Sequence, residues 1–421
     1  MKASISKSKI TGRVIAPPSK SYTIRGLMSA ALAKGRSEII NPLSSDDTEA
    51  AINVLSQVGI YVRKEQDSWQ VTGGNLHEPY TDLFCNESAA TLRFMTAICS
   101  LIPGRCQLRS GPSLAKRPVK PLIQALRQLG VDCSCQGELP PVIVEGGRLK
   151  GGTTELPGNV SSQFVSALLL ISPFAEEGMT IRLTTPLESQ PFILMTIECL
   201  KMFGIEVKTS RDLRQFEISK QTYQPTRYHV EGDWSSASYF LALGALSDEV
   251  EVTNLNPESL QGDKAILDFL RDMGASVTVN KNSAVVKSSG LSSLRADLSN
   301  CIDLLPTMAV LAATADGVSE LTGIERARLK ESNRVSTLKA GLEKMGIKVI
   351  EESNKLTIAG SEPKGSVIDT SEDHRIAMAF SLLGAVAGGT IIDDAECVSK
   401  TYPEFWDTLK SIGGEVKTDE K

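Results

Sequence analysis

The stretch LEKMGIKVIEESNKLTIAG, residues 342–360, decides the fold. It has the pattern of an amphipathic helix end, a glycine that caps the helix in the left-handed conformation, and two alternating strands that meet at a Ser353-Asn354 turn. Its first half recurs as LSQVGIYV from Leu55, LRQLGVDC from Leu126, LKMFGIEV from Leu200, LRDMGASV from Leu270 and LKSIGGEV from Leu409. The capping glycines are 71, 74, 70, 72 and 67 residues apart, and such a period is typical of a repeat architecture.

A second helix is predicted earlier in each repeat, and it starts on polar residues. Apolar residues at helical spacing follow Ser19-Lys20-Ser21, Ser161-Ser162-Gln163 and Asp373-His374-Arg375, with weaker copies from Glu87, Asp233 and Asp303. Each repeat therefore reads strand, polar-started helix, strand, glycine-capped helix and hairpin. Six such repeats predict two α/β domains of three repeats each, over 19–229 and over 1–18 plus 230–421. The N-terminal strands are expected to supply the strand that the sixth repeat lacks.

Composition excludes several classes of function. With 45 Lys plus Arg against 50 Asp plus Glu in 421 residues, the chain is mildly acidic, which argues against nucleic acid as a partner. No apolar run approaches the roughly 20 residues of a membrane helix, so we expect no membrane partner. Residues 1–12 lack the apolar core of an export signal, and eight scattered cysteines fit a reducing compartment, so we expect a cytoplasmic protein.

The sequence contains no motif for binding a metal ion or a nucleotide. The three histidines and eight cysteines show no metal-ligand spacing, so neither a metal nor another cofactor is expected. The motifs GxxxxGK[ST], GxGxxG after a strand, HExxH and GxSxG are absent. A P-loop, a dinucleotide site, a zinc protease and an α/β-hydrolase are therefore not indicated.

Positive side chains gather where the polar-started helices begin. A helix N-terminus carries unpaired N–H groups and a positive dipole end, so it attracts anions, whereas a cation there opposes the dipole. Capping explains any single Ser or Asp, and solvated surface charge explains Lys7, Lys9 and Lys34. A recurrent set of cations beside Ser, Pro and acids instead indicates an anionic ligand. The set is Lys20, Arg25, Arg93 and Arg375 in first turns, with Arg117, Lys330, Arg334 and Lys400 in loop motifs.

Two acids, Asp303 and Glu331, fall among these cations. A plain salt bridge explains Glu331 as well as a catalytic role does. The functional alternative is an acid–base pair that serves a substrate with several negative charges.

Seven motifs together resemble the EPSP synthase (3-phosphoshikimate 1-carboxyvinyltransferase) family of enolpyruvyl transferases. They are PPSKSYTIRGLMSAALA from Pro17, KRPVKPL from Lys116, GNVSSQFVSALLL from Gly158, EGDWSSASYFLA from Glu231, LKESNR from Leu329, EDHRIAMAF from Glu372 and SKTYPEFW from Ser399. The resemblance spans nearly the whole chain in the family's order. It implies two domains, each of three βαβαββ repeats around a pseudo-threefold axis (an inside-out α/β barrel), with the active site in the cleft between them.

The resemblance also implies a reaction. The enolpyruvyl group of phosphoenolpyruvate would pass to the 5-hydroxyl of shikimate 3-phosphate, with release of phosphate, on the route through chorismate to aromatic amino acids. The only partners implied are these two small molecules, with no metal or cofactor, and we expect a monomer.

Residue roles follow from the resemblance position by position. Asp303 resembles the base at the 5-hydroxyl, Glu331 the group that protonates the enol methylene, and Lys20 a residue that touches both substrates. The residues that resemble the shikimate 3-phosphate site are Lys20, Ser21, Arg25, Ser161, Ser162, Gln163, Ser189, Asp303 and Lys330. The residues that resemble the phosphoenolpyruvate site are Lys20, Ala89, Arg93, Arg117, Gln163, Arg334, Arg375 and Lys400.

Three positions depart from the family's pattern. Glu87 stands where an amide is usual, Phe192 where a tyrosine is usual, and Ala89 where glycine is usual. The family's competitor glyphosate is longer than phosphoenolpyruvate, so the Ala89 methyl predicts tolerance to it.

Two other interpretations are weighed against this one. UDP-N-acetylglucosamine enolpyruvyl transferase shares fold and donor, but Pro112 occupies the place of its loop cysteine, and it lacks a run like LKESNR. A six-repeat scaffold ring would predict an outward basic face and would not need both Asp303 and Glu331.

Overall fold

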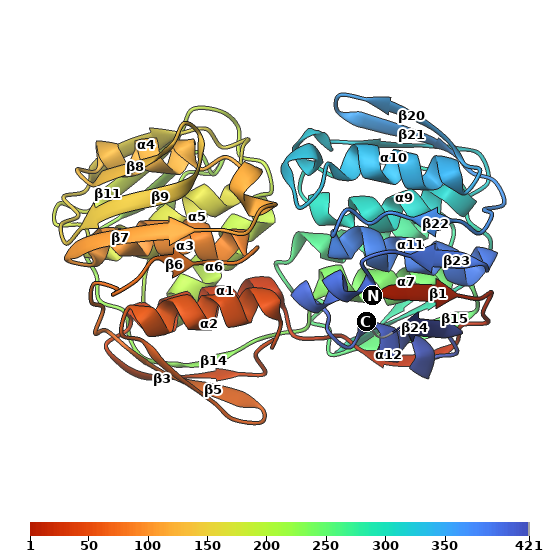
Figure 1. Ribbon diagram of the computed structural model, residues 1–421, viewed down its shortest axis with the longest axis horizontal. Helices are drawn as coiled ribbons and strands as arrows, with labels where there is room; N and C mark the ends of the chain where they lie inside the picture. The colour runs from red at the N-terminus through yellow and green to blue at the C-terminus, as the bar shows by residue number, and fades with distance from the viewer. Residues whose placement is uncertain (420–421) are drawn as a thin grey trace. The chain divides into compact units, whose positions relative to one another are not determined.

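The computed structural model describes residues 1–419, and the chain divides into two compact units (Figure 1). The N-terminal unit comprises Pro18–Val230. The C-terminal unit comprises Met1–Pro17 together with the chain from Glu231 onward. Each unit has a hydrophobic core of its own.

Every repeat builds the same four-stranded sheet. The leading strand runs parallel to the second strand, and two further antiparallel strands complete the sheet. In five repeats these two strands form a local hairpin, and in the sixth they come from the two ends of the chain.

The N-terminal unit holds three repeats. The first consists of β14 (Arg227–His229), α1 (Lys20–Leu32), β3 (Gly35–Ile40), α2 (Asp46–Gln57), β4 (Tyr61–Lys64) and β5 (Ser68–Gly73). The second consists of β6 (Leu83–Phe84), α3 (Ala89–Ile98), η1 (Cys99–Leu101), β7 (Gly104–Arg109), η2 (Leu114–Lys116), α4 (Lys120–Gln128), β8 (Asp132–Gln136) and β9 (Leu139–Gly146). The third consists of β10 (Gly152–Leu156), α5 (Ser162–Ile171), η3 (Ser172–Phe174), β11 (Met179–Leu183), α6 (Gln190–Met202), β12 (Lys208–Thr209) and β13 (Gln215–Ile218).

The C-terminal unit holds the other three. The fourth repeat consists of β2 (Gly12–Ile15), α7 (Trp234–Leu246), β15 (Glu249–Thr253), η4 (Gly262–Ala265), α8 (Ile266–Asp272), β16 (Ser276–Val279) and β17 (Ser283–Lys287). The fifth consists of β18 (Arg295–Asp297), η5 (Ile302–Leu304), α9 (Leu305–Thr314), β19 (Val318–Thr322), η6 (Glu325–Leu329), α10 (Arg334–Lys344), β20 (Lys348–Glu352) and β21 (Lys355–Ala359). The sixth consists of β22 (Val367–Ile368), α11 (His374–Ala387), β23 (Thr390–Ile392), η7 (Ala395–Lys400), α12 (Phe405–Ser411), β24 (Val416–Asp419) and β1 (Lys2–Ile5).

The chain passes between the two units twice, and the strand just before each passage pairs within the unit that the chain is leaving. β2 pairs with β15, although the chain continues from it into α1 of the other unit. In the same way β14 pairs with β3 before the chain continues into α7. β1 lies between β23 and β24, so the expectation that the N-terminal strands complete the sixth repeat is confirmed.

The polar-started helices form the centre of each unit, and Figure 1 shows the sheets at its periphery. In the C-terminal unit α7, α9 and α11 pack against one another, and α11 buries every residue from His374 to Ala385. A helix that is apolar on all sides belongs inside a core. The six repeat glycines follow the outer helices with φ between 80° and 101°, which confirms the predicted left-handed caps. Because the central helices start on polar residues, their first turns place polar side chains at one end of each unit's core.

Candidate active site

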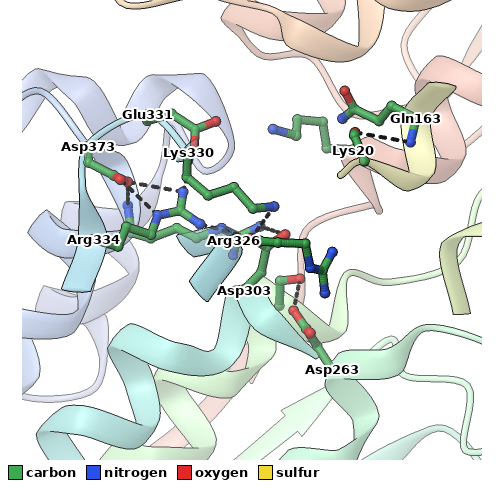
Figure 2. A network of polar contacts seen from close by, with 12 residues as sticks. Lys20, Gln163, Asp263, Asp303, Arg326, Lys330, Glu331, Arg334 and Asp373 are labelled. Carbon is green, nitrogen blue, oxygen red and sulfur yellow. Dashed lines mark hydrogen bonds and ion pairs between the residues drawn. The ribbon is translucent and has the colours of Figure 1, made fainter. Parts of the chain in front are cut away.

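Arg334 is the centre of an ion-pair network in the C-terminal unit (Figure 2). Its guanidinium donates from Nη1 to Asp303 Oδ1 (2.8 Å), from Nη2 to Glu331 Oε2 (2.6 Å) and from Nε to Asp373 Oδ2 (2.8 Å). The Arg334 side chain is 1% exposed and Asp373 is fully buried. A buried arginine with three carboxylates is held in one orientation, because moving it would leave buried charges unpaired.

Other cations reach the same carboxylates. Lys330 Nζ lies 3.2 Å from Asp303 Oδ1, and Arg375 Nη2 lies 3.4 Å from Asp303 Oδ2. Lys400 Nζ lies 3.7 Å from Glu331 Oε1. The network therefore joins Asp303 and Glu331, the two acids singled out from the sequence, through shared cations.

Three helix starts bring these residues together. Asp303 lies in η5 just before α9, Arg334 opens α10, and Asp373 caps α11. Asp373 uses Oδ1 to accept from the backbone N–H of Arg375 (3.0 Å), while its Oδ2 accepts from Arg334. The helix cap is therefore also an ion-pair partner, which the sequence pattern did not reveal.

The cations decide the ionisation of Asp303. Burial by itself would raise its pKa, but Arg375, Lys330 and Arg334 together hold the pKa of this carboxyl well below its usual range. Burial opposes the charge of Arg375 too, and Asp303 and other nearby acids outweigh it and raise the pKa of that guanidinium. Asp303 is therefore a carboxylate in the absence of substrate.

A second carboxyl near Asp303 behaves in the opposite way. Asp263, in η4, is 3% exposed and accepts a hydrogen bond from the Ser235 hydroxyl. Burial first, and then the charge of Asp303, raise the pKa of Asp263 to about 7. Two neighbouring aspartates thus have pKa values shifted in opposite directions, and such a separation lets one stay protonated while the other is ionised.

Two arginines of the N-terminal unit, Arg25 and Arg93, donate hydrogen bonds to neutral acceptors. Arg25 donates from Nε to Thr196 Oγ1 (2.8 Å), and from its Nη atoms to the carbonyls of Ser21 (3.0 Å) and Phe192 (3.1 Å). Its guanidinium also lies 5.6 Å and 5.8 Å from the ring centroids of Phe94 and Phe192. Burial lowers the pKa of Arg25 without removing its charge.

Arg93 joins the second and third repeats. Its Nη1 donates to Ser161 Oγ (3.0 Å) and Gln163 Oε1 (2.7 Å), and its Nη2 donates to the carbonyl of Pro118 (3.3 Å). The guanidinium lies 4.9 Å from the ring centroid of Phe164. The starts of α3 and α5, predicted separately from the sequence, are therefore in direct contact.

Lys20 has an acidic partner that sequence reasoning missed. Its Nζ lies 2.8 Å from Asp47 Oδ2, and Asp47 is buried in the first turn of α2. In the sequence Asp47 is one of two adjacent aspartates at the start of a helix, where the helix dipole by itself favours acidic residues.

The remaining candidates lie at helix starts or in the loops before them. Ser189 precedes α6 in the left-handed conformation, and α6 carries the Thr196 that holds Arg25. Arg117 follows η2 and is buried. The others at helix starts are Ser21 in α1, Ala89 in α3 and Ser162 in α5.

The part of the chain that the structure describes contains no candidate metal site. Within residues 1–419 no group of three or more His, Cys, Asp or Glu side chains could hold a metal ion. The cysteines of that span are all free thiols. In the same residues no helix is long and apolar enough to cross a membrane.

Comparisons with known proteins identify the family of this chain. The sequence pattern of the EPSP synthase (3-phosphoshikimate 1-carboxyvinyltransferase) family matches residues 5–409. This chain belongs to that family. A 3-phosphoshikimate 1-carboxyvinyltransferase from Dehalococcoides mccartyi is 50% identical over 421 residues, which is 100% of each chain. One from Methanosarcina mazei is 42% identical and covers 99% of each chain.

Solved structures agree with the fold. An EPSP synthase from Acinetobacter baumannii superposes with a TM-score of 0.83 at 25% identity, over 99% of this chain and 100% of that one. The enolpyruvyl transferase NikO from Streptomyces tendae, at 16% identity and a TM-score of 0.80, shares the fold. The predicted fold class, two domains of three βαβαββ repeats, is thereby confirmed, and the scaffold-ring interpretation loses its basis.

Proposed function

We propose that this chain transfers the enolpyruvyl group of phosphoenolpyruvate to the 5-hydroxyl of shikimate 3-phosphate and releases phosphate. The observation that carries the proposal is the joint placement of Asp303 and Glu331 around Arg334, with Lys330, Arg375 and Lys400 beside them. Family membership names the reaction, and this cluster holds the charges that the reaction requires.

The N-terminal unit supplies anion-binding groups. Lys20, Arg25 and the hydroxyls of Ser21, Ser161, Ser162 and Ser189 are proposed to bind shikimate 3-phosphate, together with Gln163. Arg93 and Arg117 are proposed to bind phosphoenolpyruvate, with Lys20 and Gln163 contacting both substrates. Serine hydroxyls and cations at helix starts suit phosphate oxygens, because donors and the helix dipole act in the same direction.

The C-terminal unit is proposed to carry the proton transfers. Glu331 donates a proton to C3 of phosphoenolpyruvate, which leaves C2 cationic. The 5-hydroxyl oxygen then bonds to C2 while Asp303 accepts the hydroxyl proton. The C2–O bond to phosphate then breaks and its electron pair leaves with phosphate, which takes up the proton held by Asp303. C3 returns a proton to Glu331, which restores the double bond. Arg334, Arg375 and Lys400 hold the donor's charges throughout, and Lys330 lies on the side of the 5-hydroxyl.

The cations around Asp303 also explain when it becomes a base. With three cations beside it, the carboxylate binds protons weakly. Substrate phosphate and carboxylate groups that engage Arg334, Arg375 and Lys330 would weaken this stabilisation, and the basicity of Asp303 would increase as the substrates bind.

The remaining expectations follow from this proposal. Each unit holds part of the set, so both units must act on the same two substrates during turnover. One copy of the chain carries every proposed residue, so a monomer suffices. The free thiols fit a reducing compartment such as the cytoplasm.

A phosphate-release assay tests the function. The chain is mixed with phosphoenolpyruvate and shikimate 3-phosphate, and phosphate is followed over time in the presence of a chelator. Release is expected only when both substrates are present. Release with UDP-N-acetylglucosamine in place of shikimate 3-phosphate, or dependence on an added divalent ion, would contradict the proposal.

A further inference from the structure

Glu87 forms a cap on a neighbouring loop. It lies two residues before α3 and is only partly exposed. Its Oε1 accepts from the backbone N–H of Ser113 (3.1 Å), and its Oε2 accepts from that of Leu114 (2.7 Å). Both carboxylate oxygens therefore bind N–H groups at the start of η2, which would otherwise lack helical partners.

Gly111 makes this contact possible. A Cβ on Gly111 would lie 2.2 Å from Glu87 Oε1, closer than any real contact, so a side chain there would displace the carboxylate. The backbone N–H of Gly111 also donates to the carbonyl of Asn86 (2.7 Å). Glu87 and Gly111 thus fit each other, and residues 86–87 bind the loop at three backbone N–H groups.

The bound loop carries Arg117. Leu114 begins η2, and Arg117 follows it and donates its backbone N–H to the carbonyl of Leu114 (3.0 Å). On the far side, the carbonyl of Pro118 accepts from Arg93 (3.3 Å). Arg117 therefore lies between one attachment made by Glu87 and another made by Arg93.

We propose that Glu87 is a positioning residue that fixes residues 111–117 and thereby presets Arg117 for phosphoenolpyruvate, an inference that rests on the proposed function. An asparagine, the family's usual residue here, is one methylene shorter and has a single acceptor oxygen. It cannot give two oxygens to Ser113 and Leu114 at once. In this chain a carboxylate stands where the family usually has an amide, and both of its oxygens accept hydrogen bonds from backbone N–H groups of the loop.

Glu87→Gln tests the proposal with a side chain of equal length. We expect the KM for phosphoenolpyruvate to rise about tenfold, which is about 1.4 kcal/mol. The KM for shikimate 3-phosphate should stay within twofold and kcat within threefold. The matched control is Glu78→Gln, because Glu78 is an exposed acid of the same unit whose Oε1 accepts from the backbone N–H of Arg105 (2.7 Å). An unchanged KM for phosphoenolpyruvate, or an equal rise for both substrates, overturns the proposal.

Gly111→Ala gives a second approach. It should raise the same KM, and its effect combined with Glu87→Gln should be smaller than the product of the two separate effects, because both disturb one contact. Independent effects that multiply would overturn the pairing of Glu87 with Gly111.

Hydrogen exchange separates this inference from the proposed function. In Glu87→Gln the backbone amides of Gly111 and of residues 113–117 should exchange at least tenfold faster than in the unaltered chain, whereas the Glu78→Gln control should leave them unchanged. Unchanged protection overturns the positioning role even if the enzyme is active. If the unaltered chain releases no phosphate, the proposed function fails, and the exchange result still decides whether Glu87 holds the loop.

Discussion

The two units hold their cations in different ways. In the N-terminal unit, Arg25 and Arg93 donate to hydroxyl, amide and carbonyl oxygens, which are neutral. In the C-terminal unit, Arg334 donates to three carboxylates, one of which also meets Lys330 and Arg375. Lys20, paired with Asp47, is a site cation of the N-terminal unit that follows the C-terminal pattern.

This difference suggests a division of labour. Neutral acceptors orient Arg25 without cancelling its charge, so the first arrangement suits phosphate binding. Carboxylates nearly neutralise the cations around them, so the second arrangement is sensitive to proton transfer. Substitutions in the N-terminal unit should therefore change mainly KM, and substitutions of acids in the C-terminal unit should change mainly kcat.

Asp303→Asn should have the largest effect. Asparagine keeps the size of the side chain and an acceptor oxygen for Arg334 but cannot take a proton from the hydroxyl. We expect kcat to fall by a factor of about 10² to 10⁴, the usual contribution of a general base, with phosphoenolpyruvate binding little changed. Steady-state kinetics and a direct binding measurement check both parts.

Asp268→Asn is the matched control for this prediction, because Asp268 is an acid of the same unit whose side chain is 75% exposed. A fall in kcat of less than about tenfold for Asp303→Asn would show that another group is the base.

Asp263→Asn should change how stability depends on pH. An unfolded aspartate titrates near pH 3.9, whereas the pKa of Asp263 in the folded chain is about 7. Between these values the folded chain keeps a proton that the unfolded chain has lost, so this group lowers stability as the pH rises from about 4 to about 7.

Asparagine resembles the protonated carboxyl, so it removes that pH-dependent loss. The melting temperatures of the two proteins should differ least near pH 4, and Asp263→Asn should be the more stable at pH 8. The exposed Asp407, replaced in the same way, serves as the control. A difference between the proteins that is the same at both pH values would show that Asp263 does not titrate in this range.

Arg93→Lys should weaken binding rather than turnover. One ammonium group cannot reproduce the guanidinium's contacts with Ser161, Gln163 and the Pro118 carbonyl. Lost hydrogen bonds to a charged group typically cost about 1.5–3 kcal/mol, so the KM for phosphoenolpyruvate should rise about 10- to 100-fold. Arg148→Lys, at a side chain that is 76% exposed, is the control. If kcat fell more than the KM rose, the division between the units would be wrong.

Local patterns in the sequence predicted the fold because the features that define it are themselves local. Each glycine cap and each polar helix start is encoded within a few residues, and helices α1, α5 and α11 begin at Lys20, Ser162 and His374 within the predicted motifs. The resemblance of seven motifs then supplied the reaction, which the cations alone indicated only as chemistry on an anion.

The partners within the site could not be predicted, because they depend on contacts between distant segments. Asp373 has the sequence pattern of a helix cap, and its second oxygen meets Arg334 only in the folded unit. Asp263, in the run Gln261-Gly262-Asp263, shows no local signal of being buried near Asp303. Glu87 appeared in the sequence as a departure from a family pattern, and only the loop geometry indicates its use.

Ala89→Gly should have the smallest effect, and it tests how tightly the N-terminal unit fits the phosphoenolpyruvate position. Ala89 opens α3 and is 5% exposed. An added methyl in a tight site costs about 1–3 kcal/mol, and glyphosate, being longer than phosphoenolpyruvate, should be penalised more by it. A difference of about 1.4 kcal/mol is a tenfold change in the ratio of the two affinities.

Ala89→Gly should therefore make glyphosate about tenfold more inhibitory while the KM for phosphoenolpyruvate changes less than threefold. Ala33→Gly is the control for the general loss of a methyl group, because Ala33 is fully buried and lies just after the C-terminal end of α1. The alternative is that Glu87, by holding the loop at residues 111–117, has shifted position 89 away from the ligand. Inhibition curves at fixed phosphoenolpyruvate distinguish the two: curves that overlap for the unaltered chain and Ala89→Gly would mean that the methyl does not face the inhibitor.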